Sequence, residues 1–148
     1  MTIPVTMSKT LQTRFKLRAV RAFPREYIAF LAGRRADDHL EVIDMFFPAY
    51  QKENTDDSQI TIPDEWWIRA FEYAAAKKLI VLGSVHTHTY GQGEQEYEAI
   101  PSKCDMSSWE IPDLICGIAN VVCDDNGHKS CCDINFYGRP TTCPVTFK

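Results

Sequence analysis

The chain has 148 residues, a net charge of −4 and 45% hydrophobic residues. Its length fits one compact domain, and its composition excludes wholesale disorder, collagen and coiled coil. No apolar run approaches the roughly 18 residues of a membrane span. The opening residues MTIPVTMSKT lack a signal-peptide pattern, and the acidic balance has the wrong sign for a dedicated nucleic-acid binder. We therefore expect one cytoplasmic domain over residues 1–148, with neither a membrane nor a nucleic acid as partner.

The first half of the chain predicts a helix followed by a hairpin. Apolar residues fall at helical spacing over Lys9–Ala22, and Pro24 ends that helix. The apolar run Tyr27–Gly33 predicts a buried strand, with Leu40–Phe47 as its hairpin partner and a solvated loop over Ala49–Gln59.

The second half predicts a further helix and more strands. A helix begins at Pro63 and ends near Lys77 and Lys78, with Trp67, Phe71 and Ala74 on the stripe that faces a sheet. After this helix the sequence predicts a central strand over Leu79–Val85, a strand over Leu114–Cys123, an Asn-Gly turn and a strand over Lys129–Tyr137. This order predicts the α/β (mixed) class, a mixed central β-sheet flanked by helices.

The six cysteines are Cys104, Cys116, Cys123, Cys131, Cys132 and Cys143. Cysteines in a reducing compartment are mostly free or bound to metal, and the chain has no C-x-x-C pair for a zinc ribbon. We expect mostly structural free thiols. The neighbours Cys131 and Cys132 would point to opposite faces of a strand, one toward the core and one toward solvent.

The residues after the central strand can form a metal site. His86 and His88, at i and i+2, can project to one side and offer two imidazoles to a single ion, with a downstream carboxylate as third ligand. A zinc ion held by two His and one carboxylate keeps a position for water, as catalytic sites do. H-x-H alone is also compatible with two packing histidines.

Two other candidate residues have plain structural interpretations. Ser102 and Asp105 fit a capping box at the start of a short helix, which is compatible with Asp105 being held as a metal ligand. Glu26 is equally compatible with a solvated residue between a helix and a strand.

Together, these motifs resemble those of the JAMM (MPN-plus, JAB-domain) zinc metalloproteases. That family has an upstream Glu, then H-x-H, a spacer and S-x-x-D, and its P-x-E strand resembles the segment from Phe23 to Gly33. The resemblance runs from the first helix through the Asn-Gly hairpin. It implies a cytidine-deaminase-like fold and a likeness to small stand-alone prokaryotic deubiquitinase-like members.

The resemblance also implies roles for the site residues. His86, His88 and Asp105 would be ligands of Zn²⁺, and Glu26 would be the general base that passes a proton to the leaving amine. Ser102 would help to stabilise the oxyanion. The implied activity is hydrolysis of the bond after the C-terminus of a ubiquitin-like protein, in deconjugation or precursor processing within a bacterial conjugation or antiviral system.

The chain departs from the family pattern in its spacer. Thr89 to Pro101 separates the second His from the Ser, which is longer than usual, and Thr89 replaces a frequent proline. A longer loop costs little extra entropy, so the site can persist, and this acidic loop is either a flap or a tolerated insertion. Three interpretations are open for Cys104, next to Asp105: a thiol without a role at the site, a metal contact or an oxidation-sensitive thiol. The alternative functions are a noncatalytic MPN scaffold and a zinc peptidase that acts on other peptides.

Overall fold

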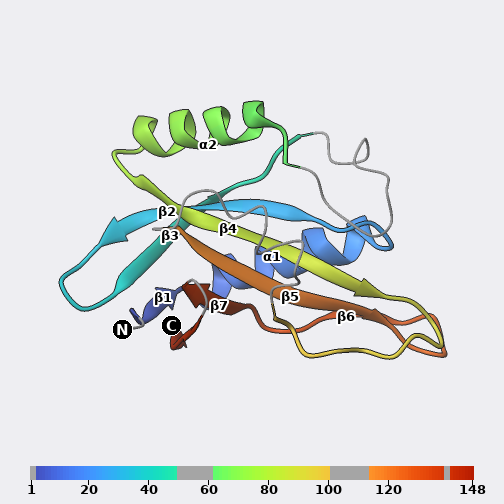
Figure 1. The fold of residues 1–148 in the computed structure, drawn as a ribbon. Coiled ribbons are helices and arrows are strands. Elements are labelled where there is room, and N and C mark those ends of the chain that lie inside the picture. The colour runs from blue at the N-terminus through green and yellow to red at the C-terminus, as the bar shows by residue number, and fades with distance from the viewer. Residues whose placement is uncertain (1–2, 50–61, 101–113, 139–140) are drawn as a thin grey trace.

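The computed structural model describes residues 3–49, 62–100, 114–138 and 141–148 (Figure 1). Two helices and nine strands follow one another within these residues, and no described helix is long and apolar enough to cross a membrane. The elements are β1 (Val5–Met7), α1 (Lys9–Ala22), β2 (Ile28–Arg35), β3 (Leu40–Phe46), α2 (Asp64–Ala76), β4 (Ile80–Tyr90), β5 (Ile115–Cys123), β6 (Lys129–Cys131), β7 (Asn135–Gly138), β8 (Thr141–Cys143) and β9 (Val145–Phe147).

All the described strands form one mixed sheet in the order β8-β7-β5-β4-β2-β3-β1-β9, with β6 paired to β5. The central pair β4–β5 is parallel, as are the pairs that β1 makes with β3 and β9. The pairs β2–β3, β2–β4 and β5–β7 are antiparallel. The expected mixed α/β class and the predicted hairpin of the first two long strands are confirmed.

The two helices cover opposite faces of the sheet, which follows from the alternation of side chains along β2 (Figure 1). Ala29 and Leu31 of β2 pack in the same cluster as Phe15 of α1. Phe30, between them, packs in a second cluster with α2, where its ring lies edge-on to Trp67 at 4.7 Å between centroids.

Helix α1 has the predicted bounds. Ser8 caps its start, because the Leu11 amide donates to the Ser8 hydroxyl at 3.0 Å. Leu11, Phe15 and Ala19 form its buried stripe, and the helix ends just before the cis peptide between Phe23 and Pro24. Its basic residues face outward on the other sides.

Helix α2 also begins after Pro63, but its predicted stripe is partly wrong. Ala74 is buried and Trp67 is half-buried, whereas Phe71 is 47% exposed. Ala70 takes the inner position instead, because the sheet contacts this helix along its small side chains.

The strands differ from prediction at three places. The central strand does not end at Val85 but continues through both histidines to Tyr90, since β2 and β5 supply partners along that length. The strand expected over Lys129–Tyr137 is divided into β6 and β7 by residues 132–134. The three-residue strands β1, β8 and β9 were not predicted. The predicted loop Ala49–Gln59 lies, except for Ala49, outside the described residues.

The cysteines within the described residues are all free thiols. Cys131 packs against the α1 side of the core and Cys132 is exposed, as expected for this pair. Burial raises the pKa of Cys131 to about 12, so this thiol stays protonated at neutral pH. Cys104 lies outside the described residues.

Candidate metal centre

The two histidines of the H-x-H motif lie on one face of β4, toward the C-terminal end of the strand. This is the face of the sheet that carries the cluster packed against α2. His86 is 5% exposed with a buried Nε2, and His88 is half-buried. Their ring centroids are 5.2 Å apart, with 60° between the ring planes. The register with β2 shows which face this is, because His86 pairs with Ile28, and Ile28 belongs to that cluster.

Glu26 lies beside this pair because the β2–β4 pairing continues past its last ladder residue. The Thr87 amide donates to the Tyr27 carbonyl at 3.0 Å, and the Tyr27 amide donates to the Thr87 hydroxyl at 2.8 Å. Glu26 directly precedes Tyr27, so these contacts place its backbone alongside the stretch of β4 that carries the two histidines. The Thr89 hydroxyl donates to the Pro24 carbonyl at 3.0 Å, which holds the segment before Glu26 against the end of β4.

Tyr90 extends this face by two residues beyond His88. Burial raises the pKa of its hydroxyl, and the negative charges of Glu96 and Glu26 raise that pKa further. Of these two carboxylates, Glu26 precedes β2 and Glu96 belongs to the loop that follows β4.

The geometry of the two imidazoles fits a shared zinc ion. When two imidazoles bind one tetrahedral zinc through nitrogens about 2.0–2.1 Å away, their ring centroids are roughly 5 Å apart. The separation of 5.2 Å matches that arrangement. Hard and borderline ions also favour a carboxylate as further ligand, which is the role predicted for Asp105.

Ser102 and Asp105 lie outside the described residues. Within residues 3–49, 62–100, 114–138 and 141–148, no group of three or more His, Cys, Asp or Glu side chains is placed to hold a metal. Of the five predicted site residues, the structure places His86 and His88 next to each other on β4 and Glu26 in the segment beside that strand. The roles of all five stay predictions.

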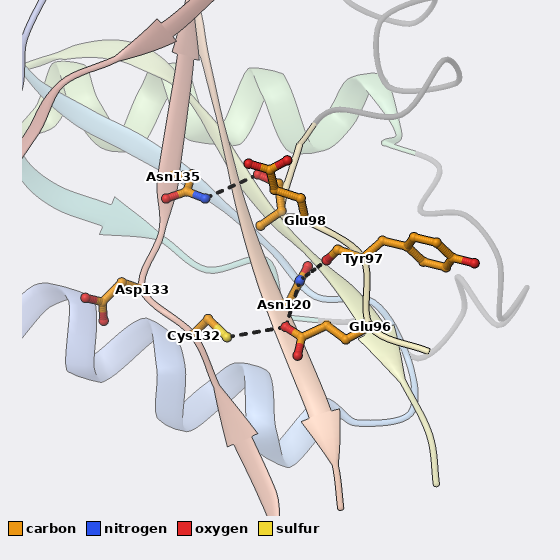
Figure 2. A pocket seen from close by; sticks show the side chains of 8 residues that line it. Glu96, Tyr97, Glu98, Asn120, Cys132, Asp133 and Asn135 are labelled. Atoms are coloured by element: carbon orange, nitrogen blue, oxygen red, sulfur yellow. Dashed lines mark hydrogen bonds between the residues drawn. The ribbon is translucent and has the colours of Figure 1, made fainter. Parts of the chain in front are cut away.

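An acidic pocket next to this face was not predicted from the sequence. It has a volume of about 330 Å³ and lies between the loop after β4, the strand β5 and the segment between β6 and β7 (Figure 2). Asn120 of β5 forms its buried wall and pairs in register with His88. A signal was present: Asn120 is a polar residue inside the apolar stretch Ile115–Cys123, and Glu96 and Glu98 are in the acidic loop.

Comparison with known proteins gives the family. The sequence pattern described as prokaryotic homologs of the JAB domain matches residues 8–130, which include Glu26, His86 and His88. The chain belongs to the prokaryotic JAB-domain family. This membership confirms the resemblance recognised from the motifs. No curated protein sequence matches the chain.

Solved structures with this JAB-domain fold include two bacterial proteins. A solution structure from Desulfitobacterium hafniense has a TM-score of 0.64 at 16% identity, covering 97% of this chain and 92% of its own. A second, from Salinibacter ruber, has a TM-score of 0.61 at 20% identity, covering 92% of this chain and 81% of its own. A JAB1/MPN domain protein from Archaeoglobus fulgidus is similar at a TM-score of 0.49 and 16% identity, covering 98% of both chains. At these identities the first two likenesses concern the fold alone.

Proposed function

We propose that this JAB domain is a zinc-dependent peptidase that hydrolyses the bond after the C-terminus of a ubiquitin-like protein. The observation that supports this most is the pair of imidazoles 5.2 Å apart on the face of β4, with Glu26 in the segment hydrogen-bonded alongside that strand. A noncatalytic scaffold has no need for two imidazoles on one half-buried face with a carboxylate in the neighbouring segment. The bond cleaved is an isopeptide bond in deconjugation or a peptide bond in precursor processing.

Each candidate site residue has its own role in the proposed reaction. His86, His88 and Asp105 would hold the zinc ion, which when bound supplies a Lewis acid that polarises the scissile carbonyl and makes water more acidic. Glu26 takes the proton from the attacking water and donates it to the leaving amine. Ser102 donates a hydrogen bond to the oxygen that becomes negative in the transition state.

An open stretch of sheet edge supports the choice of an extended protein tail as substrate. β3 pairs with β1 only over Leu40–Val42, so within the described residues the outer side of Ile43–Phe46 has no strand partner. An extended peptide can add to such an edge through main-chain hydrogen bonds. Phe46 pairs with Phe30 of β2, two residues from Ile28, so a tail on this edge ends near the level of His86, with β3 and β2 between it and β4.

The test combines metal content with cleavage. We expect about one zinc per parent chain and its loss in folded His88→Ala. Glu26→Gln keeps its zinc and its fold, but kcat falls by about 10²–10⁴-fold, because the proton carrier is removed. The substrates are bacterial ubiquitin-like proteins, each carrying a C-terminal fluorescent leaving group.

Other outcomes would favour the alternatives. A folded parent that binds no zinc when zinc is supplied would favour the noncatalytic MPN scaffold. Zinc-dependent hydrolysis of unrelated peptides, with the ubiquitin-like fusion left intact, would favour a peptidase of other specificity. Cleavage that survives Glu26→Gln would contradict the proposed mechanism.

A further inference from the structure

The acidic pocket beside β4 presents hydrogen-bond acceptors to solvent. Most of its lining side chains are exposed, and three of them are carboxylates (Figure 2). The lining residues are Glu96, Tyr97, Glu98, Ala99, Asn120, Cys132, Asp133 and Asn135.

The negative charge of this pocket is only partly neutralised by the protein. Lys16 of α1 pairs with Asp133, and it is the one basic side chain in the described part of the chain that forms an ion pair with a pocket carboxylate. Glu96 accepts a hydrogen bond from Asn120, and Cys132 donates to the same carboxylate oxygen at 3.7 Å, but neither donor is charged. Glu96 and Glu98 therefore leave an uncompensated negative charge at the pocket.

Asn120 gives an observation that is independent of the acidic residues. Its side chain is almost fully buried, at 2% exposed, and its Nδ2 donates to Glu96 at 3.0 Å and to the Tyr97 carbonyl at 2.6 Å. Its Oδ1 is buried and has no hydrogen-bond partner within the part of the chain that the structure describes. A buried acceptor without a donor is unfavourable, so its retention in the pocket wall points to a donor that arrives with a ligand.

At the inner end of the pocket the backbone acceptor is already satisfied, so the acceptors left for a ligand are those of the carboxylates and Asn120. The Ala99 carbonyl already accepts from the Tyr137 hydroxyl at 2.6 Å and from Asn135 at 3.4 Å. Burial raises the pKa of Tyr137, and the charge of Glu98 raises it further, which puts the Glu98 carboxylate near this hydroxyl. A ligand that suits this pocket carries a positive charge and several N–H donors, as the side chains of arginine and lysine do.

We propose that this pocket binds a positively charged arginine or lysine side chain of the protein substrate. Asn120 pairs with His88 in the parallel β4–β5 register, so the pocket adjoins the candidate metal centre on the β5 side, whereas Glu26 adjoins it on the β2 side. The identification of the ligand's owner as the substrate rests on the proposed function. The binding of the cationic group itself does not.

The first experiment measures binding without cleavage. The probes are three acetylated, amidated peptides, Gly-Gly-Xaa-Gly-Gly, with arginine, lysine or the neutral arginine isostere citrulline as Xaa. Each is titrated into the full chain while the side-chain amide signals of Asn120 are followed by NMR. We expect arginine or lysine to shift these signals with at least about tenfold higher affinity than citrulline, because the charge is what the carboxylates recognise.

Variants locate the binding. Glu96→Gln/Glu98→Gln keeps the size of both side chains but removes their charge and replaces one acceptor oxygen of each with an NH₂ donor, and should weaken the binding of the cationic peptides at least about tenfold. Glu72→Gln, at an exposed position on α2, is the matched control and should leave it unchanged. Equal affinity for citrulline, or equal effects of the pocket variant and the control, would overturn the proposal.

Cleavage kinetics then separate this proposal from the proposed function. In an active enzyme, the pocket variant should raise KM for the protein substrate with kcat and zinc content retained. If the chain binds the cationic peptides selectively but cleaves no substrate, the proposed function is contradicted and the proposal of a cation-binding pocket stands. If parent and pocket variant cleave the protein substrate with the same KM, the pocket does not bind the substrate, and the proposed function stands.

Discussion

Asp44 of β3 joins the sheet to the C-terminal end of α2 through a single carboxylate. Its Oδ2 accepts from the Tyr73 hydroxyl at 2.8 Å and from the Lys77 ammonium, and its Oδ1 accepts from the Met45 amide at 2.8 Å. Burial raises the pKa of Asp44, but these donors outweigh it, and the net pKa lies below the ordinary 3.8. The ionised carboxylate is therefore the form that the fold stabilises.

We predict that Asp44→Asn lowers the free energy of unfolding by about 1–2 kcal/mol at pH 7, because the neutral amide is a weaker acceptor for the ammonium. A lowered folded-state pKa gives stability that is complete above the unfolded-state pKa and is lost as pH falls through the folded-state pKa. The difference between parent and variant should therefore shrink in acid. Urea unfolding at pH 7 and at stepwise lower pH measures it, and a difference that does not change with pH would contradict the assignment.

At the candidate site, the sequence was informative where a residue type is tied to chemistry. Glu26, His86 and His88 were singled out because their order matches a family motif, and the structure places the two imidazoles 5.2 Å apart on β4. Asn120 was passed over because a polar residue in an apolar strand has meaning only once its neighbours in space are known. Its partners Glu96 and Tyr97 are more than twenty residues away in the chain.

Among the elements, those with strong local signals were predicted best. Helix α1 was predicted to the residue because its apolar spacing is regular and Pro24 follows its last turn. The extension of β4 through His86 and His88 was missed, since polar residues in a strand are stabilised by neighbouring strands and not by their own propensity. The strands β1, β8 and β9 are too short to show a period.

Gly33 lies at a bulge in β2, where the register with β3 shifts between Ala32 and Gly33. A Cβ at this position would lie 1.8 Å from the Glu41 carbonyl oxygen, which is backbone and cannot move aside. We predict that Gly33→Ala lowers the free energy of unfolding by at least about 2 kcal/mol in urea titrations. Gly91→Ala is the control: its Cβ would meet only the flexible end of Glu94, so a loss as large as that of Gly33→Ala would refute this explanation.

At the scale of the whole molecule, the two ends of the chain close one edge of the sheet. β9 pairs in parallel with β1, and the Val5 amide donates to the Pro144 carbonyl at 2.7 Å while the Lys148 amide donates to the Met7 carbonyl at 2.8 Å. The strand order puts β9 four positions from β4. The edge that the two chain ends stabilise is therefore separate from the strand that carries the candidate metal centre.

We predict that removing residues 145–148 lowers Tm by about 4–8 °C, because it deletes backbone hydrogen bonds that hold β1 and exposes its edge. Zinc content of the folded truncated chain should equal that of the parent. Calorimetry and metal analysis on the same preparations provide both values. Loss of zinc without loss of folding would show that the edge and the metal centre are coupled.

The parallel pairing of β1 with β9 also bears on chain connectivity. Val5 pairs with Val145 and Met7 with Phe147, so the start of the chain and its end are separated by little more than the length of a three-residue strand, as the neighbouring N and C marks in Figure 1 illustrate. A short glycine-rich linker can join them. New ends can then be opened at the exposed Asp124–Gly127 turn between β5 and β6. Such a circular permutant should fold to the same sheet, because no strand pair has to be broken to make it.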